Sequence, residues 1–330
     1  MINNFWLVTN YSCNNRCSWC YTEPAEFNCE LMPLDYAKDV LKEMHKNGAK
    51  KCTLIGGEPT LVPYLAELIA YGKELGLFMK LVTNGRMISD RKFLKKLKNA
   101  GLSLVAISIH SNDPKTHNKI TKTHSFDETI QGVKNCIKEK IDFVTLTTIS
   151  KMNKNDIFNT AKFLSEIGVK KIIFNIAAPG MDDGGITKFV LAPDVIAKTI
   201  TKNFKLLKQE KIKAEFYATT PLCLYEKNDL RDMINDGYLM PLSKGGCNIF
   251  DGSGFGIDPS GDVIPCTHMV EEKLVSTMDK KGNYLYHGKF PKLWKKIEKR
   301  FGIQNWDYPS KKCLTCEYKK ECIGGCPLFW

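Results

Sequence analysis

The chain has 330 residues, of which 43% are hydrophobic and 25% are charged, and its formal net charge is +12 at pH 7. The apolar fraction excludes wholesale disorder, and no stretch approaches the roughly 18 uncharged apolar residues of a membrane-spanning helix. The N-terminus, MINNFWLVTN, lacks the basic and apolar regions of a signal peptide, so a cytoplasmic protein with no membrane partner is predicted.

From residue 5 to residue 215, short apolar runs alternate with amphipathic segments. The runs are rich in Val, Ile, Thr or Phe, as buried parallel strands are. The segments between them have helical spacing, and four of them end at a glycine. This alternation predicts an α/β fold, with a parallel sheet that is either open or barrel-like. The predicted strands are residues 5–9, 52–55, 78–83, 102–109, 143–149 and 171–176.

After residue 215 we expect this alternation to stop. Residues 240–330 are rich in Gly, Pro, Cys and aromatic residues, with one helical segment, FPKLWKKIEKRF. Small segments of this kind usually need a metal or disulfides to stay folded. The sequence therefore predicts a main domain at residues 1–215, a connecting segment at 216–240 and a cysteine-rich domain at 241–330.

The thirteen cysteines are unevenly spread. In a reducing compartment they are better explained as metal ligands than as disulfides. Cys52 and Cys136 stand alone in a strand-like and a helical segment, and they are predicted to be small buried side chains. Cys29 and Cys223 stay unassigned. The clustered cysteines are Cys13, Cys17, Cys20, Cys313, Cys316, Cys322 and Cys326, with Cys247 and Cys266 on either side of a predicted PSGD turn.

Cys13, Cys17 and Cys20 directly follow the first predicted strand. The loop at that end of a strand carries the active-site ligands in α/β sheets and barrels. Three thiolates so close together suit a soft metal or an iron–sulfur cluster. A closed structural site takes four protein ligands, so three leave one position open, as in catalytic metal sites. A zinc site completed by a distant ligand is the alternative.

The segment CNNRCSWCY resembles the C-x3-C-x2-C motif of the radical S-adenosylmethionine (radical SAM) enzymes, including the aromatic residue before the last cysteine. GGEPT at residues 56–60 strengthens the resemblance. It implies that residues 1–215 form a partial (β/α)6 TIM-like barrel. It also implies that the three cysteines hold three irons of a catalytic [4Fe–4S] cluster, whose fourth iron binds S-adenosylmethionine (SAM). Reduction then releases a 5′-deoxyadenosyl radical, which abstracts hydrogen from a substrate.

Further site residues follow from the same resemblance. Two adjacent glycines also permit close backbone approach and unusual φ, which would expose peptide groups to a ligand. Thr147 and Thr148 are equally explained as ordinary β-branched strand residues. The cofactor-binding residues implied are Gly56, Gly57, Glu58, Pro59, Asn84, Ser108 and Thr147.

The segment HNKITKTHSF resembles another family stretch through His117, Ile120, Ser125 and Phe126. Thr121 stands where the family often has a cofactor-facing arginine, which leaves that contact in doubt. The other two histidines of this region, His110 and His124, are predicted to be packing or surface residues.

The C-terminal pattern Cys313-x2-Cys316-x5-Cys322-x3-Cys326 fits one closed four-thiolate site for zinc or a [4Fe–4S] cluster. With Cys247 and Cys266 it resembles the SPASM extension of radical SAM enzymes, which implies one or two auxiliary [4Fe–4S] clusters. By this resemblance Cys247, Cys266 and Cys326 serve one cluster, and Cys313, Cys316 and Cys322 serve the other. Each set is one ligand short, so Cys223, an Asp or Glu, the substrate or no ligand fills the gap, or a single auxiliary cluster exists.

Enzymes with this extension mostly modify peptides, so we expect a maturase of a ribosomally made peptide. Its products would be a carbon–carbon or thioether crosslink or an epimer, and its partners the precursor peptide and an electron donor such as flavodoxin or ferredoxin. Where sulfatase-maturing enzymes have an Asp as general base, this chain has Thr267 and then His268. The candidate catalytic residues are His268, as a base, and Cys223; a histidine that merely flanks a ligand is the alternative.

Two other functions stay open at this point. A radical SAM enzyme acting on a small molecule such as a tetrapyrrole would keep every cysteine argument. A zinc-binding protein that binds nucleic acid would use the charge for phosphate. The basic residues form no stripe with interleaved aromatics, so no nucleic-acid partner is expected. We also expect no separate leader-binding domain before Cys13.

Overall fold

The computed structural model describes residues 3–21, 31–179, 186–217, 220–240, 254–301, 309–322 and 324–329. Its main strands are β1 (Asn4–Val8), β2 (Lys51–Ile55), β3 (Phe78–Thr83), β4 (Leu104–Ser108), β5 (Phe143–Ile149), β6 (Ile172–Ile176), β7 (Glu215–Tyr217) and β8 (Leu239–Met240). Its helices are α1 (Leu34–Lys46), α2 (Leu65–Glu74), α3 (Arg91–Asn99), α4 (Pro114–Thr121), α5 (Phe126–Lys138), α6 (Ile157–Glu166), α7 (Pro193–Gln209), α8 (Lys227–Asn235), α9 (Phe290–Phe301) and α10 (Lys319–Cys322).

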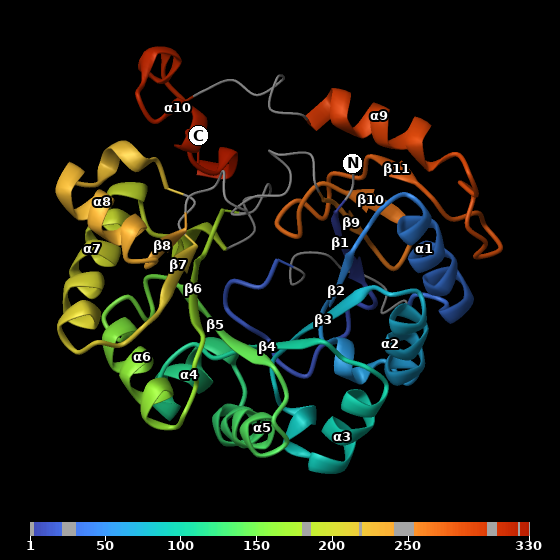
Figure 1. The fold of residues 1–330 in the computed structure, drawn as a ribbon, viewed down its shortest axis with the longest axis horizontal. Helices are drawn as coiled ribbons and strands as arrows, with labels where there is room; N and C mark the ends of the chain where they lie inside the picture. Colours follow the sequence, from blue (N-terminus) through green and yellow to red (C-terminus); the bar gives the residue numbers. More distant parts are fainter. Residues whose placement is uncertain are drawn as a thin grey trace.

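All strands from β1 to β8 are parallel to their neighbours and follow one another in chain order. The sheet continues on the other side of β1 with β9 (Gly256–Ile257), β10 (Asp262–Ile264) and β11 (Val275–Ser276). Figure 1 shows that the sheet is curved and that the helices from α1 to α8 lie on its outer side. This arrangement confirms the predicted α/β fold with a partial barrel.

The six predicted strands correspond to β1 through β6, each within two residues of the predicted bounds. The predicted end of the alternation at residue 215 is wrong, because β7, α8 and β8 add a further unit to the sheet. These two strands have only three and two residues, which is too short for an apolar run to stand out. The domain boundaries at residues 215 and 240 stay a prediction.

The core lies between the sheet and the helices that cover it. Cys52 and Cys136 are fully buried in this core, which confirms them as structural side chains. The four helices predicted to end at glycine are followed by glycines with positive φ, a conformation that Gly adopts without strain. These glycines are Gly48, Gly76, Gly101 and Gly168.

The C-terminal segment joins the main sheet through a hairpin. β9 pairs in parallel with β1, and β10 pairs antiparallel with β9. The predicted PSGD turn connects the two strands, with Gly261 at φ +78° and its amide donating to the Asp258 carbonyl over 2.9 Å. No helix in the described part of the chain combines the length and the apolar character that a membrane span requires.

Candidate active site

Four loops that carry predicted site residues meet at one edge of the sheet. The strands from β1 to β4 are parallel neighbours, so their carboxyl ends lie side by side. The GGEPT motif (residues 56–60), the TNG motif (residues 83–85) and the SIHS motif (residues 108–111) stand at the ends of β2, β3 and β4. Residues 9–21, which we call the cluster loop, follow β1. The fold thus gathers these motifs at the edge where α/β proteins bind ligands.

Gly56 and Gly57 press against the backbone of the cluster loop. A Cβ atom on Gly57 would lie 2.3 Å from the Ser12 carbonyl oxygen, and one on Gly56 would lie 2.4 Å from that of Asn10. The amides of Gly57 and Glu58 donate to the Asn10 and Ser12 carbonyls, each over 2.8 Å. The predicted close approach is therefore to the chain itself. The predicted unusual φ is wrong, since neither glycine has a positive φ.

Glu58 is a buried carboxylate that joins the ends of β2 and β3. Its Oε1 atom accepts from the Thr60 amide over 3.0 Å, the Thr60 hydroxyl over 2.5 Å and the Thr83 hydroxyl over 2.7 Å. Its Oε2 atom accepts from the Asn84 amide over 2.7 Å. Burial raises the pKa of this carboxyl, against the effect of these donors. The side chain is thus held rigidly beside the cluster loop.

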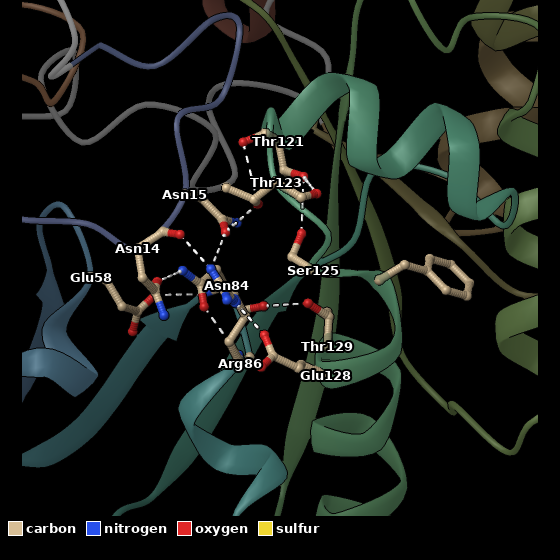
Figure 2. Close-up of polar contacts among 12 residues, drawn as sticks. Asn14, Asn15, Glu58, Asn84, Arg86, Thr121, Thr123, Ser125, Glu128 and Thr129 are labelled. Carbon is tan, nitrogen blue, oxygen red and sulfur yellow. Dashed lines mark hydrogen bonds and ion pairs between the residues drawn. The ribbon is translucent and has the colours of Figure 1, made fainter.

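Asn84 reaches from the end of β3 to the cluster loop (Figure 2). Its side-chain nitrogen donates to the Asn14 side-chain oxygen over 2.6 Å and to Cys13 Sγ over 3.9 Å. The Asn15 amide donates to the same sulfur over 3.3 Å. Burial raises the pKa of the Cys13 thiol to about 11, so without a metal this thiol is protonated near neutral pH. Such N–H donors are what a metal-bound thiolate needs around its sulfur.

Arg86 also holds the cluster loop in place, although it is not among the site residues predicted from the sequence. Its guanidinium donates to the Asn14 carbonyl and, over 3.2 Å, to the Asn15 side chain. It also forms an ion pair with Glu128 on α5 (Figure 2). The Thr123 hydroxyl donates to the Asn15 side chain over 2.9 Å. The one signal in the sequence is that Arg86 directly follows the TNG motif.

The cluster loop also pairs with the end of α4. The Arg16 amide donates to the Thr121 carbonyl and the Ser18 amide to the Ile120 carbonyl, both over 2.9 Å. The Thr121 hydroxyl lies 2.9 Å from Ser125 Oγ and is buried. At the position where an arginine is frequent, this chain therefore uses a backbone carbonyl to hold the loop that carries the cysteines.

The comparisons with known proteins agree with this geometry. The sequence model of the Radical SAM superfamily matches residues 7–164, which include the cluster loop and the motifs at the ends of β2, β3 and β4. Residues 7–164 therefore form a radical SAM domain.

Two curated relatives come from Methanosarcina barkeri. The AdoMet-dependent heme synthase is 25% identical over 328 residues, which are 97% of this chain and 89% of the relative. The Fe-coproporphyrin III synthase is 34% identical over 172 residues, which are 51% of this chain and 42% of the relative. The chain thus spans most of one relative and less than half of the other.

Among solved structures, the chain is similar to Streptococcus suis SuiB bound to the precursor peptide SuiA. The TM-score is 0.76 at 16% sequence identity, and the match covers 99% of this chain and 72% of SuiB. At this identity the likeness concerns the fold. Because the match covers nearly the whole chain, the shared fold extends beyond the barrel into the C-terminal segment.

The cluster loop suits the [4Fe–4S] cluster and SAM that enzymes of this superfamily use. Its three thiols are soft ligands, and amide donors flank the Cys13 sulfur. Among the described residues, no three His, Cys, Asp or Glu side chains converge on a point where a single ion would be held. An iron–sulfur cubane attaches each thiolate to a different iron, so its ligands need not converge on one point.

Two predicted SAM contacts differ in their surroundings. Ser108 ends β4 and is half-buried at the rim of the sheet. Thr147 is buried on β5, and its hydroxyl donates to the Ile109 carbonyl over 2.5 Å. The Thr147 hydroxyl is thus used as a donor within the sheet, whereas the Ser108 hydroxyl makes no hydrogen bond to another described residue.

His110 and His117 form a buried pair beside the cluster loop. Their rings stack at a centroid distance of 5.9 Å, and Trp19 meets His110 edge-on at 5.2 Å. Burial lowers the pKa of His110 to about 3, helped by the charge of His117, and burial alone lowers that of His117 to about 4. Both rings are therefore neutral at neutral pH. His110 is a packing residue and His124 is exposed, as predicted.

Cys266 and His268 lie close to the cluster loop. His268 Nδ1 is 3.7 Å from Cys266 Sγ, and its ring lies 5.8 Å from that of Tyr21 at the end of the loop. Burial acts to raise the pKa of Cys266, but the hydrogen bonds and charge of His268 outweigh it, so this pKa is lowered. The imidazole is therefore engaged with the thiol next to it. This contact favours a role for His268 in orienting Cys266 over a role as a general base.

The remaining predicted ligands are only partly described. Cys313, Cys316 and Cys326 are half-buried and Cys322 is buried, while Cys223 is exposed. Cys247, of the predicted set Cys247, Cys266 and Cys326, and the unassigned Cys29 lie outside the described residues.

Proposed function

We propose that this radical SAM enzyme abstracts a hydrogen atom from a ribosomally made precursor peptide, leading to a crosslink or an epimer. The observation that carries the proposal is the fold likeness to peptide-bound SuiB across nearly the whole chain. Both the partial barrel and the extension take part in that likeness. A peptide substrate is therefore supported by the extension as well as by the barrel.

In this proposal Cys13, Cys17 and Cys20 hold the catalytic cluster, and the rim formed by the ends of β2, β3 and β4 binds SAM. When bound, the cluster and SAM together supply a 5′-deoxyadenosyl radical for hydrogen abstraction. Glu58 and Asn84 fix the rim against the cluster loop. The remaining contacts to SAM are assigned to Gly56, Gly57, Pro59, Ser108 and, more weakly, Thr147.

The auxiliary ligands and the electron donor complete the proposal. Cys266 lies near the end of the cluster loop, because its Sγ atom is 3.7 Å from His268 Nδ1 and the His268 ring is 5.8 Å from that of Tyr21. A cluster held in part by Cys266 would therefore stand close to the catalytic one. The low-potential electron would come from a flavodoxin or ferredoxin.

A tetrapyrrole substrate is the second candidate. The observation in its favour is the match to the AdoMet-dependent heme synthase over 97% of this chain. A tetrapyrrole and a peptide need different clefts around the same radical source, and 25% identity leaves the substrate-facing residues free to differ. The zinc-binding alternative loses its ground, since the chain is a radical SAM enzyme.

The test is co-expression with short peptides encoded beside the gene, followed by mass spectrometry and chiral analysis of the hydrolysed peptide. We expect a loss of two hydrogens for a crosslink, or an unchanged mass with a D-residue for an epimer. A peptide unchanged by both measures, together with a visible absorption shift on adding an iron coproporphyrin, would replace the peptide by the tetrapyrrole.

A further inference from the structure

The turn that carries Cys223 is built firmly into the core of the protein. Leu222 is buried, and the hydroxyls of Thr220 and Tyr225 lie 2.8 Å apart on either side of it. Cys223 itself is exposed at this turn. The chain therefore presents one thiol at the surface from a fixed backbone, although Cys223 stands far in sequence from every cysteine cluster.

Cys322 meets this turn directly. Its Sγ atom accepts from the Leu222 amide over 3.2 Å, and the Gly324 amide donates to the same sulfur. Two N–H donors on one sulfur stabilise a thiolate and are typical of iron–sulfur ligands. A second link joins the two segments, because Lys227 and Glu317 form an ion pair of 2.9 Å. The segment with the last cysteines is thus docked on the turn that carries Cys223.

The cysteines of both segments lie beside this contact. Cys223 directly follows Leu222, whose amide lies 3.2 Å from Cys322 Sγ. Within the C-terminal segment, the Cys316 amide donates to the Cys313 carbonyl over 3.3 Å, and the Cys322 amide donates to the Tyr318 carbonyl over 2.8 Å. These turns hold Cys313, Cys316 and Cys322 in one short segment that is docked beside Cys223.

We propose that Cys223 is the fourth thiolate of an iron–sulfur site whose other ligands are Cys313, Cys316 and Cys322. The proposal rests on the auxiliary cluster of the proposed function and gives it the ligand that the C-terminal spacing does not supply. When each thiol binds an iron of the cluster, it loses a proton and forms one sulfur–iron bond, and this ligation step changes no oxidation state.

The spacing of these thiols favours a cluster over a single ion. A zinc ion needs four sulfurs at about 2.3 Å from one point, and the described thiols do not converge in that way. Four thiolates on four different irons stand further apart, as in a [4Fe–4S] cluster. The four ligands would also link the turn at residues 220–225 to the segment that contains Cys313, Cys316 and Cys322.

The experiment uses the full chain with Cys13, Cys17 and Cys20 all changed to alanine, so that iron in the cluster loop does not mask the auxiliary site. This parent and its Cys223→Ala variant are reconstituted anaerobically with iron and sulfide. Iron, sulfide and zinc are counted, and the EPR spectra are recorded. We expect Cys223→Ala to lose about one to four irons per chain and to show the signal of a three-iron cluster or none at that site.

A parent with Cys136→Ala is the matched control, since it also lacks one thiol but loses a buried one that faces no other cysteine. We expect it to keep the parent's iron and spectrum. Thermal unfolding followed by circular dichroism shows whether each variant folds, and Cys223→Ser serves if the alanine variant does not. Equal iron and spectra with and without Cys223, or zinc in place of iron, would overturn the proposal. SAM cleavage by the chain with its cluster loop intact tests the proposed function separately.

Discussion

At the scale of single residues, the site depends on polar side chains that hold the cluster loop rather than on the cysteines alone. Glu58 accepts four hydrogen bonds from three residues on two strand ends. Removing a buried acceptor of this kind lowers the free energy of unfolding, because each donor left without a partner is also shielded from water. The loop geometry therefore follows from the Glu58 carboxylate.

We predict that Glu58→Gln lowers the free energy of unfolding by about 1–3 kcal/mol. The new amide nitrogen would face either the Asn84 amide or the Thr60 amide and the hydroxyls of Thr60 and Thr83, so in each orientation it meets at least one backbone N–H donor. Urea unfolding of the apoprotein measures the effect. Glu67→Gln is the control, since its ion pair with Lys38 lies at the surface and contributes little to stability. Equal losses in the two variants would contradict the prediction.

The cysteine triplet, the GGEPT motif and Asn84 could be predicted from the sequence because their chemistry is local and their spacing is specific. Arg86 could not, since its role arises only when residues about 70 positions away fold against it. The surroundings of Thr147 show the same limit. A hydroxyl on a strand serves a ligand or a carbonyl next to it, and only the register of the sheet decides which.

At the scale of elements, the contact between the end of β2 and the cluster loop is set by a missing side chain. Gly57→Ala would place a Cβ atom 2.3 Å from one carbonyl oxygen of the loop and 2.4 Å from another. Backbone atoms cannot yield as a flexible side chain does. The loop or the strand end must therefore move.

We predict that Gly57→Ala lowers the amount of iron bound after reconstitution and destabilises the apoprotein by about 1–3 kcal/mol. Gly76→Ala is the control, because a Cβ there meets no atom within 4 Å although φ is +81°. Gly76→Ala would lower the free energy of unfolding by about 1 kcal/mol and leave the iron content unchanged. Normal iron binding by Gly57→Ala would show that the close contact is unimportant for the site.

The β9–β10 hairpin carries a buried carboxylate. Asp258 is fully buried, accepts from the Asp262 amide over 2.8 Å and from the Tyr11 hydroxyl over 3.3 Å, and lies 3.9 Å from Lys273 Nζ. Burial, helped by the charge of Asp262, raises its pKa to about 6, above that of the unfolded chain. The folded state therefore favours the protonated form of Asp258.

We predict that the stability from Asp258 is fully present below about pH 4 and is lost as the pH rises through about 6. Asp258→Asn keeps the shape and removes this titration. From pH 4 to pH 7 the variant should gain about 1–3 kcal/mol of stability relative to the wild type, as measured by urea unfolding at each pH. A difference that does not depend on pH would refute this.

At the scale of the whole molecule, the sheet joins the barrel to the C-terminal extension. The main strands could be predicted from apolar runs, since strands such as β2, β4 and β6 bury consecutive residues. The last unit, β7–α8–β8, could not, because Phe216 and Leu239 belong to strands of three and two residues. No local sequence pattern predicts that β9 pairs with β1, which lies about 250 residues earlier in the chain.

The same holds for the C-terminal site. The spacing of the last four cysteines predicts a metal site, but it does not show that Cys322 docks on the turn carrying Cys223. Only the folded chain brings together cysteines that are about 100 residues apart. The overall fold thus decides which cysteines share a site.

The central claim is that the cluster loop holds the catalytic cluster, and reductive cleavage of SAM tests it most directly. The anaerobically reconstituted protein is mixed with SAM and dithionite, and 5′-deoxyadenosine is measured by liquid chromatography and mass spectrometry. We predict formation by the wild type and by Cys52→Ala, and none above background by Cys17→Ala. Cleavage that persists in Cys17→Ala, or a colourless wild type that contains zinc, would contradict the account.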